Sequence, residues 1–366
     1  MKGLYFCDGT VILPDRTVPR GAVLVADGRI AEVGREEDIG CPEGCEKVGA
    51  DGGYIGPGYV DLHVHGGAGA DFMDGTAAAW RTALRAHARH GTTSVAPTTA
   101  VAAPAPLRVA LDLASAGVAE RGFGLWDGEP GARVLGAHFY GPYFAQGAEG
   151  CHPAQPLRLP EADESADYLR DDGAVCTASV APELPGAEAF ARAVVARGIC
   201  LNLGHSNATF AEVEAAIGWG AQHVDHLFCA MSDKSKLRSE PGAPSYPMRG
   251  GLLEAALYFD ELSTEVIADG RHLAPDLLRL ALKLKGPERL ILVTDCNRAL
   301  DMPDGRALAS GCMGMDHMVR TFYAQTGAAL EVVVRMASAT PAAIVGRTDI
   351  GSLEKGKCAD VLILNE

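Results

Sequence analysis

Two histidines separated by a single residue, His63 and His65, close an apolar run that begins near Tyr59. Residues i and i+2 of a strand point to the same side, so both imidazoles can face one point and share a cation. Two surface histidines beside the glycine-rich turn that follows would give the same pattern. The pair alone therefore leaves a metal site and a solvent-exposed turn equally open.

Three more polar residues stand where apolar runs end. His205 follows the run from Ile199, His226 follows His223-Val224-Asp225, and Asp295 follows the run from Leu290. Imidazole and carboxylate are the donors that zinc and similar divalent ions prefer, and neutral imidazole is available near pH 7. A cation held by such a set lowers the pKa of water towards neutrality. Together with His63 and His65, these residues predict a hydrolytic metal centre.

The elements that must carry these residues alternate along the chain. Eight short apolar runs are expected to be strands; they lie near residues 59–63, 92–97, 134–138, 178–182, 199–205, 223–226, 264–270 and 290–295. Helical segments are expected between them, for example over 74–90, 187–197, 210–219 and 275–285. Eight strands alternating with helices predict an α/β fold, a (β/α)8 TIM-type barrel over residues 56–345. In such a barrel the strand ends that carry the polar residues surround the active site.

The two ends of the chain have a different character. Residues 1–55 contain short alternating apolar runs separated by turns, and the Asp27-Gly28 step between two of them is a hairpin signal. The segment 346–366 repeats this pattern. We expect the two ends to meet in a small antiparallel β-sandwich domain, 1–55 plus 346–366.

The composition of the chain limits the kinds of molecule that it is expected to bind. The chain of 366 residues has 32 basic and 47 acidic residues, a formal net charge of −15. This argues against a nucleic-acid partner, which requires an excess of basic side chains. The N-terminus lacks the apolar run of a signal peptide. The sequence also contains no run of about 18 apolar residues, the length that a membrane-spanning helix needs. The ten cysteines are scattered. We expect reduced thiols and a cytoplasmic protein.

Several segments together resemble one family, the N-acetylglucosamine-6-phosphate deacetylases of the amidohydrolase superfamily. The matching segments are 57–67 (PGYVDLHVHGG), 91–94 (GTTS), 97–98 (PT), 204–209 (GHSNAT), 225–231 (DHLFCAM), 267–272 (IADGRH), 292–295 (LVTD), 339–342 (ATPA) and 351–360 (GSLEKGKCAD). The resemblance runs from about residue 50 to the C-terminus in the family's order.

The resemblance implies roles for individual residues. His63, His65, His205, His226 and Asp295 would be metal-site residues. Asp295 would also be catalytic, taking a proton from the attacking water and returning it to the leaving amine. The substrate would be contacted by His152 in 149–153 (EGCHP), by Cys229 and Ala230, and by His272. Without the resemblance, exposed loop histidines would explain His152 and His272 equally well. The family also implies a homodimer and an amino-sugar substrate, phosphorylated or not.

One departure from the family concerns the metal. Where the family carries His-x-Glu-Gly-Pro, this chain has 138–142 (HFYGP), so Tyr140 replaces a metal-binding glutamate. A phenol with a pKa near 10 is a poor zinc ligand. We therefore expect one tightly held divalent cation, zinc first among the candidates, and we expect Tyr140 to donate a hydrogen bond to substrate or water.

Other departures concern the substrate. Cys229 replaces an asparagine of the family, and Arg238 stands in a lengthened segment that would hold a phosphate. Arg298 brings a cation near Asp295.

Removal of an N-acyl group from an amino sugar is the leading hypothesis for the function. A deaminase or another single-metal amide hydrolase is the alternative among enzymes, and a sugar-binding protein without catalysis is the alternative from another class.

Overall fold

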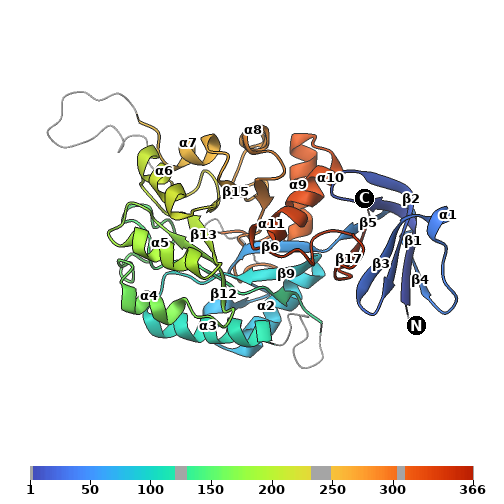
Figure 1. Cartoon of the computed structure of the whole chain (residues 1–366), viewed down its shortest axis with the longest axis horizontal. Helices are drawn as coiled ribbons and strands as arrows, with labels where there is room; N and C mark the ends of the chain where they lie inside the picture. The colour runs from blue at the N-terminus through green and yellow to red at the C-terminus, as the bar shows by residue number, and fades with distance from the viewer. Residues whose placement is uncertain (1–2, 120–129, 232–248, 303–309, 366) are drawn as a thin grey trace.

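In the computed structural model of the chain, residues 3–119, 130–231, 249–302 and 310–365 are described. Parallel strands occupy the centre of its larger part (Figure 1). They are β6 (Tyr59–Val64), β9 (Thr92–Pro97), β10 (Arg133–Val134) with β11 (Ala137–Phe139), β12 (Val175–Val180), β13 (Cys200–Leu203), β14 (His223–Val224), β15 (Ser263–Val266) and β16 (Leu290–Leu292). If β10 and β11 are taken as one interrupted strand, these match the eight predicted strands in order.

The strands close into a barrel. Hydrogen bonds join β10, β9 and β6 in one group and β11 to β16 in a second, and the pairs within both groups are parallel. A parallel bridge between Thr98 and His138 connects the groups on one side, and a parallel bridge between Val64 and Cys296 connects them on the other. The predicted (β/α)8 barrel is thereby confirmed.

Helices follow the strands and lie outside them. They are α2 (Ala77–Arg89), α3 (Pro104–Ala119), α4 (Ala162–Tyr168), α5 (Ala187–Ala196), α6 (Phe210–Trp219), α7 (Leu252–Tyr258), α8 (Pro275–Lys285), α9 (Met315–Thr326), α10 (Leu330–Met336) and α11 (Ala339–Ile344). Residues close in sequence define the start of two of these helices. Thr209 and Glu212 form a reciprocal capping box at the N-terminus of α6, and Pro275 is the first residue of α8. The predictions for 210–219 and 275–285 agree with α6 and α8 to the residue.

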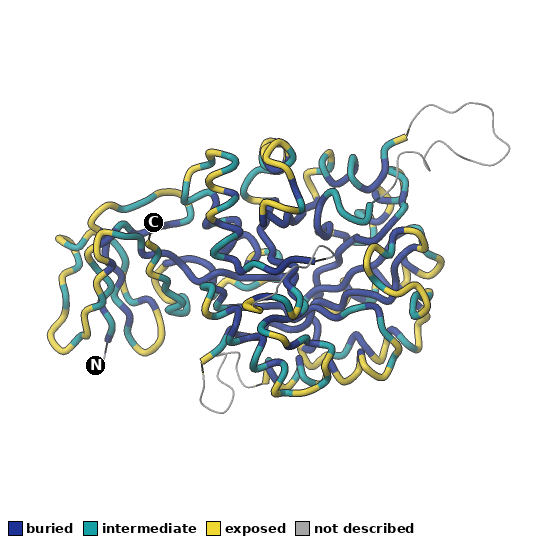
Figure 2. Tube along the Cα trace, turned by 180° about the vertical axis from the view of Figure 1, so that it is seen from behind, coloured by how far each residue is buried: buried dark blue, intermediate teal, exposed yellow. Residues whose placement is uncertain are grey.

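Figure 2 shows buried strands at the centre and exposed outer faces on the helices. All six residues of β6 and all four of β13 are buried. Such strands need no polar alternation, because helices cover one face and the packed barrel interior the other. A polar residue within these strands therefore requires a specific partner. A short β7 (Gly66–Gly67), β8 (Ala70–Asp71) and a 3-10 turn η1 (Phe72–Asp74) lead from β6 to α2.

The smaller part of the molecule is a sheet built from both ends of the chain (Figure 1). Its elements are β1 (Gly3–Ile12), β2 (Thr17–Ala26), β3 (Arg29–Arg35), α1 (Glu36–Ile39), β4 (Glu46–Gly49), β5 (Tyr54–Pro57) and β17 (Val361–Leu364). Asp27 and Gly28 form the predicted two-residue turn, both with positive φ. The expected pairing was antiparallel throughout, but β4 and β5 run parallel to β1, so one mixed sheet results.

The barrel and the sheet are joined by an ion pair with little solvent access. Nη1 and Nη2 of Arg133, on β10, lie 2.8 and 3.2 Å from the two carboxylate oxygens of Asp360, just before β17. The side chains are only 8% and 17% exposed. A bidentate pair in such a place anchors β17 against the barrel, since a guanidinium buried without its carboxylate is costly.

Removing this carboxylate is expected to destabilise the protein. The change Asp360→Ala leaves the guanidinium of Arg133 without its bidentate partner, so the free energy of unfolding should fall by about 3 kcal/mol. Guanidinium chloride titration followed by circular dichroism measures it. The control is Asp260→Ala, which breaks an Arg–Asp pair that is 42% and 75% exposed and should cost less than about 1 kcal/mol. Equal losses in the two variants would contradict the assignment.

Among the described residues, no helix is at once long and apolar enough to cross a lipid bilayer.

Candidate metal centre and substrate cavity

A cavity of about 460 Å³ lies where the barrel strands end. Most of the residues singled out from the sequence line it, although they come from widely separated parts of the chain. They are His65, Tyr140, His152, His205, His226, Cys229, Ala230, His272 and Asp295. His63 lies fully buried beside them, and its ring is 5.4 Å from that of His65. The strand-end residues thus meet at one place, as their positions in the sequence predicted.

The backbone at this place is unusual. His205, Ala230 and Asp295 have φ values of 47°, 49° and 46°, in the left-handed region that residues other than glycine seldom adopt. Each follows the end of a barrel strand, where the chain turns away. Such conformations are retained where the surrounding structure holds them, and they gather at functional sites. At His205 and Asp295 the turn brings the side chain into the cavity wall.

The first group within the cavity can hold a cation. His63, His65 and Asp295 offer ligand atoms that all lie within 4.8 Å of one another. Oδ1 of Asp295 lies 3.4 Å from Nε2 of His65 and 3.8 Å from Nε2 of His63. Nε2 of His63 is buried without a hydrogen-bond partner. A buried nitrogen without a partner is costly, and a cation between these atoms would satisfy it. The donor set therefore fits a divalent ion such as zinc.

The charges of this group are set by their neighbours. Burial alone would raise the pKa of Asp295, but the hydrogen bond from His65 and the nearby charge of His63 outweigh it and lower that pKa. For His63, burial opposes the charged form, but the adjoining Glu265 carboxylate outweighs it and raises the pKa of His63 to about 10. Asp295 is therefore an ionised carboxylate at neutral pH, able to bind a cation or to accept a proton.

Tyr140 occupies the space between the other two histidines. Its hydroxyl oxygen contacts Nε2 of His205 and lies 2.6 Å from Nε2 of His226, and these two nitrogens are 3.1 Å apart. Burial raises the pKa of Tyr140 well above its usual value, so the phenol keeps its proton. The expectation from the sequence was a hydrogen bond to substrate or water; the structure directs the hydroxyl to His205 and His226.

Hydrogen bonding assigns the protons of this second group. Nδ1 of His205 lies 2.7 Å from the carbonyl oxygen of Ala148, which can only accept, so this nitrogen carries the proton of the neutral ring. Nε2 of His205 then accepts the hydroxyl proton of Tyr140. The phenol oxygen in turn accepts from Nε2–H of His226, whose Nδ1 is buried without a partner. Both Nε2 atoms that a cation would need are thus engaged by Tyr140.

Glu265 was missed in the sequence analysis. It lies in the middle of β15, only 1% exposed, and its carboxylate contacts Nδ1 of His63, 202 positions away in the sequence. Asp225 lies close enough to complete a second acidic group with His63 and Glu265. Its oxygens are already hydrogen-bonded to Ser179 at 2.6 Å and to Asn202 at 2.8 Å. The available signal was a carboxylate inside an otherwise uncharged, buried strand.

The same cavity is lined by the residues expected to meet the substrate. Nδ1 of His272 lies 2.8 Å from Asp269, whose carboxylate raises the pKa of His272. Burial, with the neighbouring His65 and His226, lowers the pKa of His152 to about 3, so that ring is neutral. Cys229 and Ala230 line the same cavity. Arg238, expected to hold a phosphate, lies outside the described residues.

Arg298 is held at the rim of the barrel by two acidic residues. Its Nη2 lies 2.9 Å from Asp74 and 3.7 Å from Asp71, and the side chain is 53% exposed. Asp71 lines the cavity and Arg298 does not, so the expected cation stands beside the cavity lining and not within it. Among the described residues that line the cavity, there is no lysine or arginine.

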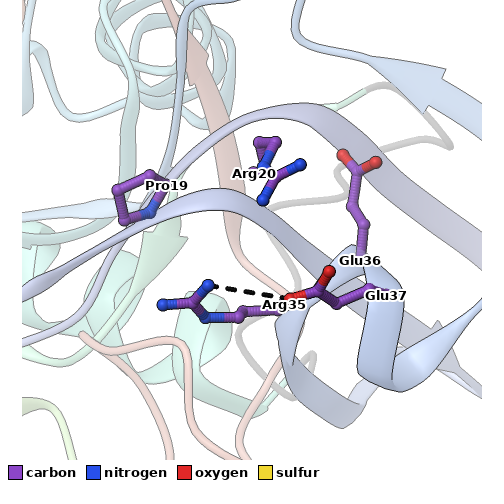
Figure 3. Close-up of a pocket in the computed structure, with 5 residues that line it drawn as sticks. All are labelled: Pro19, Arg20, Arg35, Glu36 and Glu37. Atoms are coloured by element: carbon purple, nitrogen blue, oxygen red, sulfur yellow. Dashed lines mark ion pairs between the residues drawn. The ribbon is translucent and has the colours of Figure 1, made fainter.

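A second hollow, on the small domain, has a different character. Figure 3 shows its lining: Pro19, Arg20, Arg35, Glu36 and Glu37. Nη1 of Arg35 lies 3.7 Å from Glu37 in an exposed pair. This lining contains no histidine or cysteine, and both candidate metal-ligand groups among the described residues lie in the barrel.

Comparisons with known proteins agree with this geometry. Residues 54–366 match the family model described as "Amidohydrolase family". The chain is 33% identical over 331 residues to N-acetylglucosamine-6-phosphate deacetylase of Vibrio furnissii, covering 84% of this chain and 78% of that protein. It is 32% identical over 337 residues to N-acetylgalactosamine-6-phosphate deacetylase of Escherichia coli O157:H7, covering 86% and 84%.

A solved structure is similar over nearly the whole chain. It is a mutant of N-acetyl-D-glucosamine-6-phosphate deacetylase from Mycobacterium smegmatis in complex with N-acetyl-D-glucosamine-6-phosphate. The TM-score is 0.84 at 26% identity, and the match covers 99% of this chain and 95% of that one. The similarity therefore includes both the barrel and the small sheet.

Proposed function

Because the chain belongs to the amidohydrolase family, we propose that it is a metal-dependent deacetylase that hydrolyses the N-acetyl group of an amino sugar carrying a 6-phosphate. The observation that carries this proposal is the group formed by His63, His65 and Asp295 at the end of the barrel, with a buried imidazole nitrogen that lacks a partner. The sugar class comes from the relatives, which are named for N-acetylglucosamine-6-phosphate and N-acetylgalactosamine-6-phosphate.

His63, His65 and Asp295 would hold the cation, which, when bound, lowers the pKa of water and polarises the acyl oxygen. Asp295 accepts a proton as the water oxygen forms its bond to the acyl carbon. The carbon–nitrogen bond then breaks, and Asp295 returns that proton to the departing nitrogen. The products are acetate and the free amino sugar. The ionised state of Asp295 suits the first of these proton transfers.

One cation is proposed, and zinc is the ion of choice. The hydroxyl of Tyr140 engages Nε2 of both His205 and His226, so these histidines are not free to complete a second centre. Two imidazoles and one carboxylate, with a position left open for water, form a donor set typical of catalytic zinc. His205 and His226 then serve to hold Tyr140 in the cavity wall.

Residues outside the cation group would bind the sugar and its phosphate. His272 and His152 are placed to donate or accept hydrogen bonds from sugar hydroxyls, while Cys229 and Ala230 shape the wall. The two named substrates of the relatives differ only in the configuration at C4. A comparison of both epimers, each with and without the 6-phosphate, therefore defines the specificity.

The proposed function predicts acetate release that depends on the cation. Purified enzyme with added zinc should release acetate from at least one N-acetylhexosamine 6-phosphate, and the unphosphorylated sugar should react more slowly by at least about tenfold, since it lacks one charged contact. Removing the cation with a chelator should lower the rate at least about 100-fold, and zinc should restore it. An enzyme-coupled acetate assay measures each rate.

Other products would contradict this proposal. Release of ammonia without acetate from a panel of amino sugars and other amides would identify a deaminase. No turnover in the panel, combined with no bound cation in the purified protein, would identify a sugar-binding protein without catalysis. Turnover that persists after complete removal of the cation would exclude the proposed centre.

We also propose a cytoplasmic homodimer. The structure describes all ten cysteines as free thiols, which suits a reducing compartment. Sedimentation at several protein concentrations tests the dimer, and fractionation of cells tests the compartment.

A further inference from the structure

Glu265 is a buried carboxylate that the proposed mechanism does not use. It occupies the third position of β15 (Ser263–Val266), is 1% exposed, and is not among the residues lining the cavity. An ionised carboxylate in the interior of a protein costs several kcal/mol unless it is paired and hydrogen-bonded. Its presence in a strand of the barrel therefore calls for a specific set of partners.

Those partners lie on or just after β14 and on β6, and one of them, His63, belongs to the cation group. Oε1 of Glu265 contacts Nδ1 of His63 and accepts the backbone N–H of His226 at 2.9 Å. Oε2 lies 3.3 Å from Nε2 of His223. One carboxylate thus joins the strand that carries His63 to the strand that precedes His226.

The contact determines how the ring of His63 is oriented relative to Asp295. A carboxylate oxygen only accepts, so the hydrogen bond places a proton on Nδ1 of His63. The raised pKa of His63 belongs to the ring without a cation. In the neutral ring, the form that would bind a cation, the lone pair lies on Nε2, the buried nitrogen without a partner, 3.8 Å from Oδ1 of Asp295. A carboxylate behind a metal-binding imidazole fixes its tautomer and orientation and increases its basicity.

We propose that Glu265 is a positioning residue of the cation centre, holding His63 with Nε2 directed at the ion. The inference rests on the proposed function only in taking His63 as a cation ligand. A purely structural role predicts something different: Glu265 would then contribute to stability by joining strands, without changing cation affinity.

Asp225 provides a matched control for that difference. It is also fully buried and lies beside the same strands, but its carboxylate bonds to Ser179 and Asn202. Either amide substitution replaces one buried carboxyl group in the barrel interior with a group of the same size. Both carboxylates lie near His63, but of the two only Glu265 is hydrogen-bonded to it.

The test is the zinc affinity of the full-length protein. Apo-protein would be titrated with Zn²⁺ against a chromophoric chelator for wild type, Glu265→Gln and Asp225→Asn, with circular dichroism and thermal unfolding of each apo-protein. Glu265→Gln should raise the Kd for zinc by about 10- to 100-fold, and Asp225→Asn by less than about threefold. Visible spectra of the Co²⁺-loaded proteins should change for Glu265→Gln alone, because the ligand field depends on His63.

Two results would overturn the inference: a Kd for Glu265→Gln within about threefold of wild type, or equal losses of affinity in both variants. If Glu265→Gln does not fold, Glu265→Asp keeps the charge but shortens the reach to His63, and it should also weaken zinc binding. The measurement uses no substrate. If the wild type released no acetate, the proposed reaction would be rejected, but the measured zinc affinities would still test the role of Glu265. If Glu265→Gln bound zinc as tightly as wild type, the role of Glu265 would be rejected, but the proposed reaction would not.

Discussion

Replacing Asp295 by asparagine should lower kcat by about 10³-fold, the largest effect we expect from one substitution in this chain. Asparagine keeps the size of the side chain and one oxygen, but it cannot accept a proton from water or return one to the leaving nitrogen. Because Asp295 also belongs to the cation group, the variant must be assayed at saturating zinc, so that loss of proton transfer is separated from loss of the ion. Initial rates of acetate release give kcat and KM.

The matched control for this change lies at the rim of the barrel. Asp74→Asn removes a carboxylate that pairs with the exposed Arg298, outside the cavity lining, and should leave kcat within about twofold of wild type. If Asp295→Asn, saturated with zinc and folded, retained more than about a tenth of wild-type kcat, Asp295 would not be the proton carrier.

The second large effect concerns the number of cations. Wild type should retain about one zinc per chain after gel filtration, whereas Tyr140→Glu should retain about two. The substitution removes the phenol from between Nε2 of His205 and Nε2 of His226 and supplies a carboxylate in its place. Nδ1 of His205 donates to the carbonyl oxygen of Ala148, so its Nε2 lone pair becomes available to an ion. Metal analysis by mass spectrometry measures the ratio.

Tyr140→Phe distinguishes the added ligand from the removed hydroxyl. Phenylalanine also breaks the contacts to His205 and His226 but offers no donor, so this variant should keep about one zinc per chain. Two tightly held ions in the wild type would refute the single centre and would require Tyr140 to move away from both imidazoles. Two in the phenylalanine variant would show that the histidines alone suffice.

Tyr140 and Glu265 carry the two proposals about the cation centre. Tyr140 stands on the segment that follows β11, where the family pattern has a carboxylate, and Glu265 supplies a carboxylate within β15, behind His63. The proposed effect of Tyr140 is on the number of ions held. The proposed effect of Glu265 is on the affinity for one ion. The two substitution series test these statements separately, because one measures stoichiometry and the other affinity.

Much of the barrel and of the cavity follows from local pattern. Short buried strands give continuous apolar runs, and in a parallel barrel the polar residues just after such runs meet at one end. That rule predicts the positions of His205, His226 and Asp295 from the sequence. A helix end can also be predicted where the capping residues are close in sequence, as Thr209 and Glu212 are at the start of α6.

Contacts between side chains of distant strands depend on closure of the barrel. Glu265 meets His63 across 202 residues, and Tyr140 meets His226 across 86, although neither pair comes from adjacent strands; the closed barrel directs side chains from several strands into one interior. A short stretch of sequence does not show which of these inward-facing side chains will meet. Arg298 illustrates the converse: it lies three positions from Asp295, but two acidic residues near β8 hold it at the surface. Local sequence pattern is enough to place polar residues at the mouth of the barrel, whereas closure of the barrel sets which of them touch.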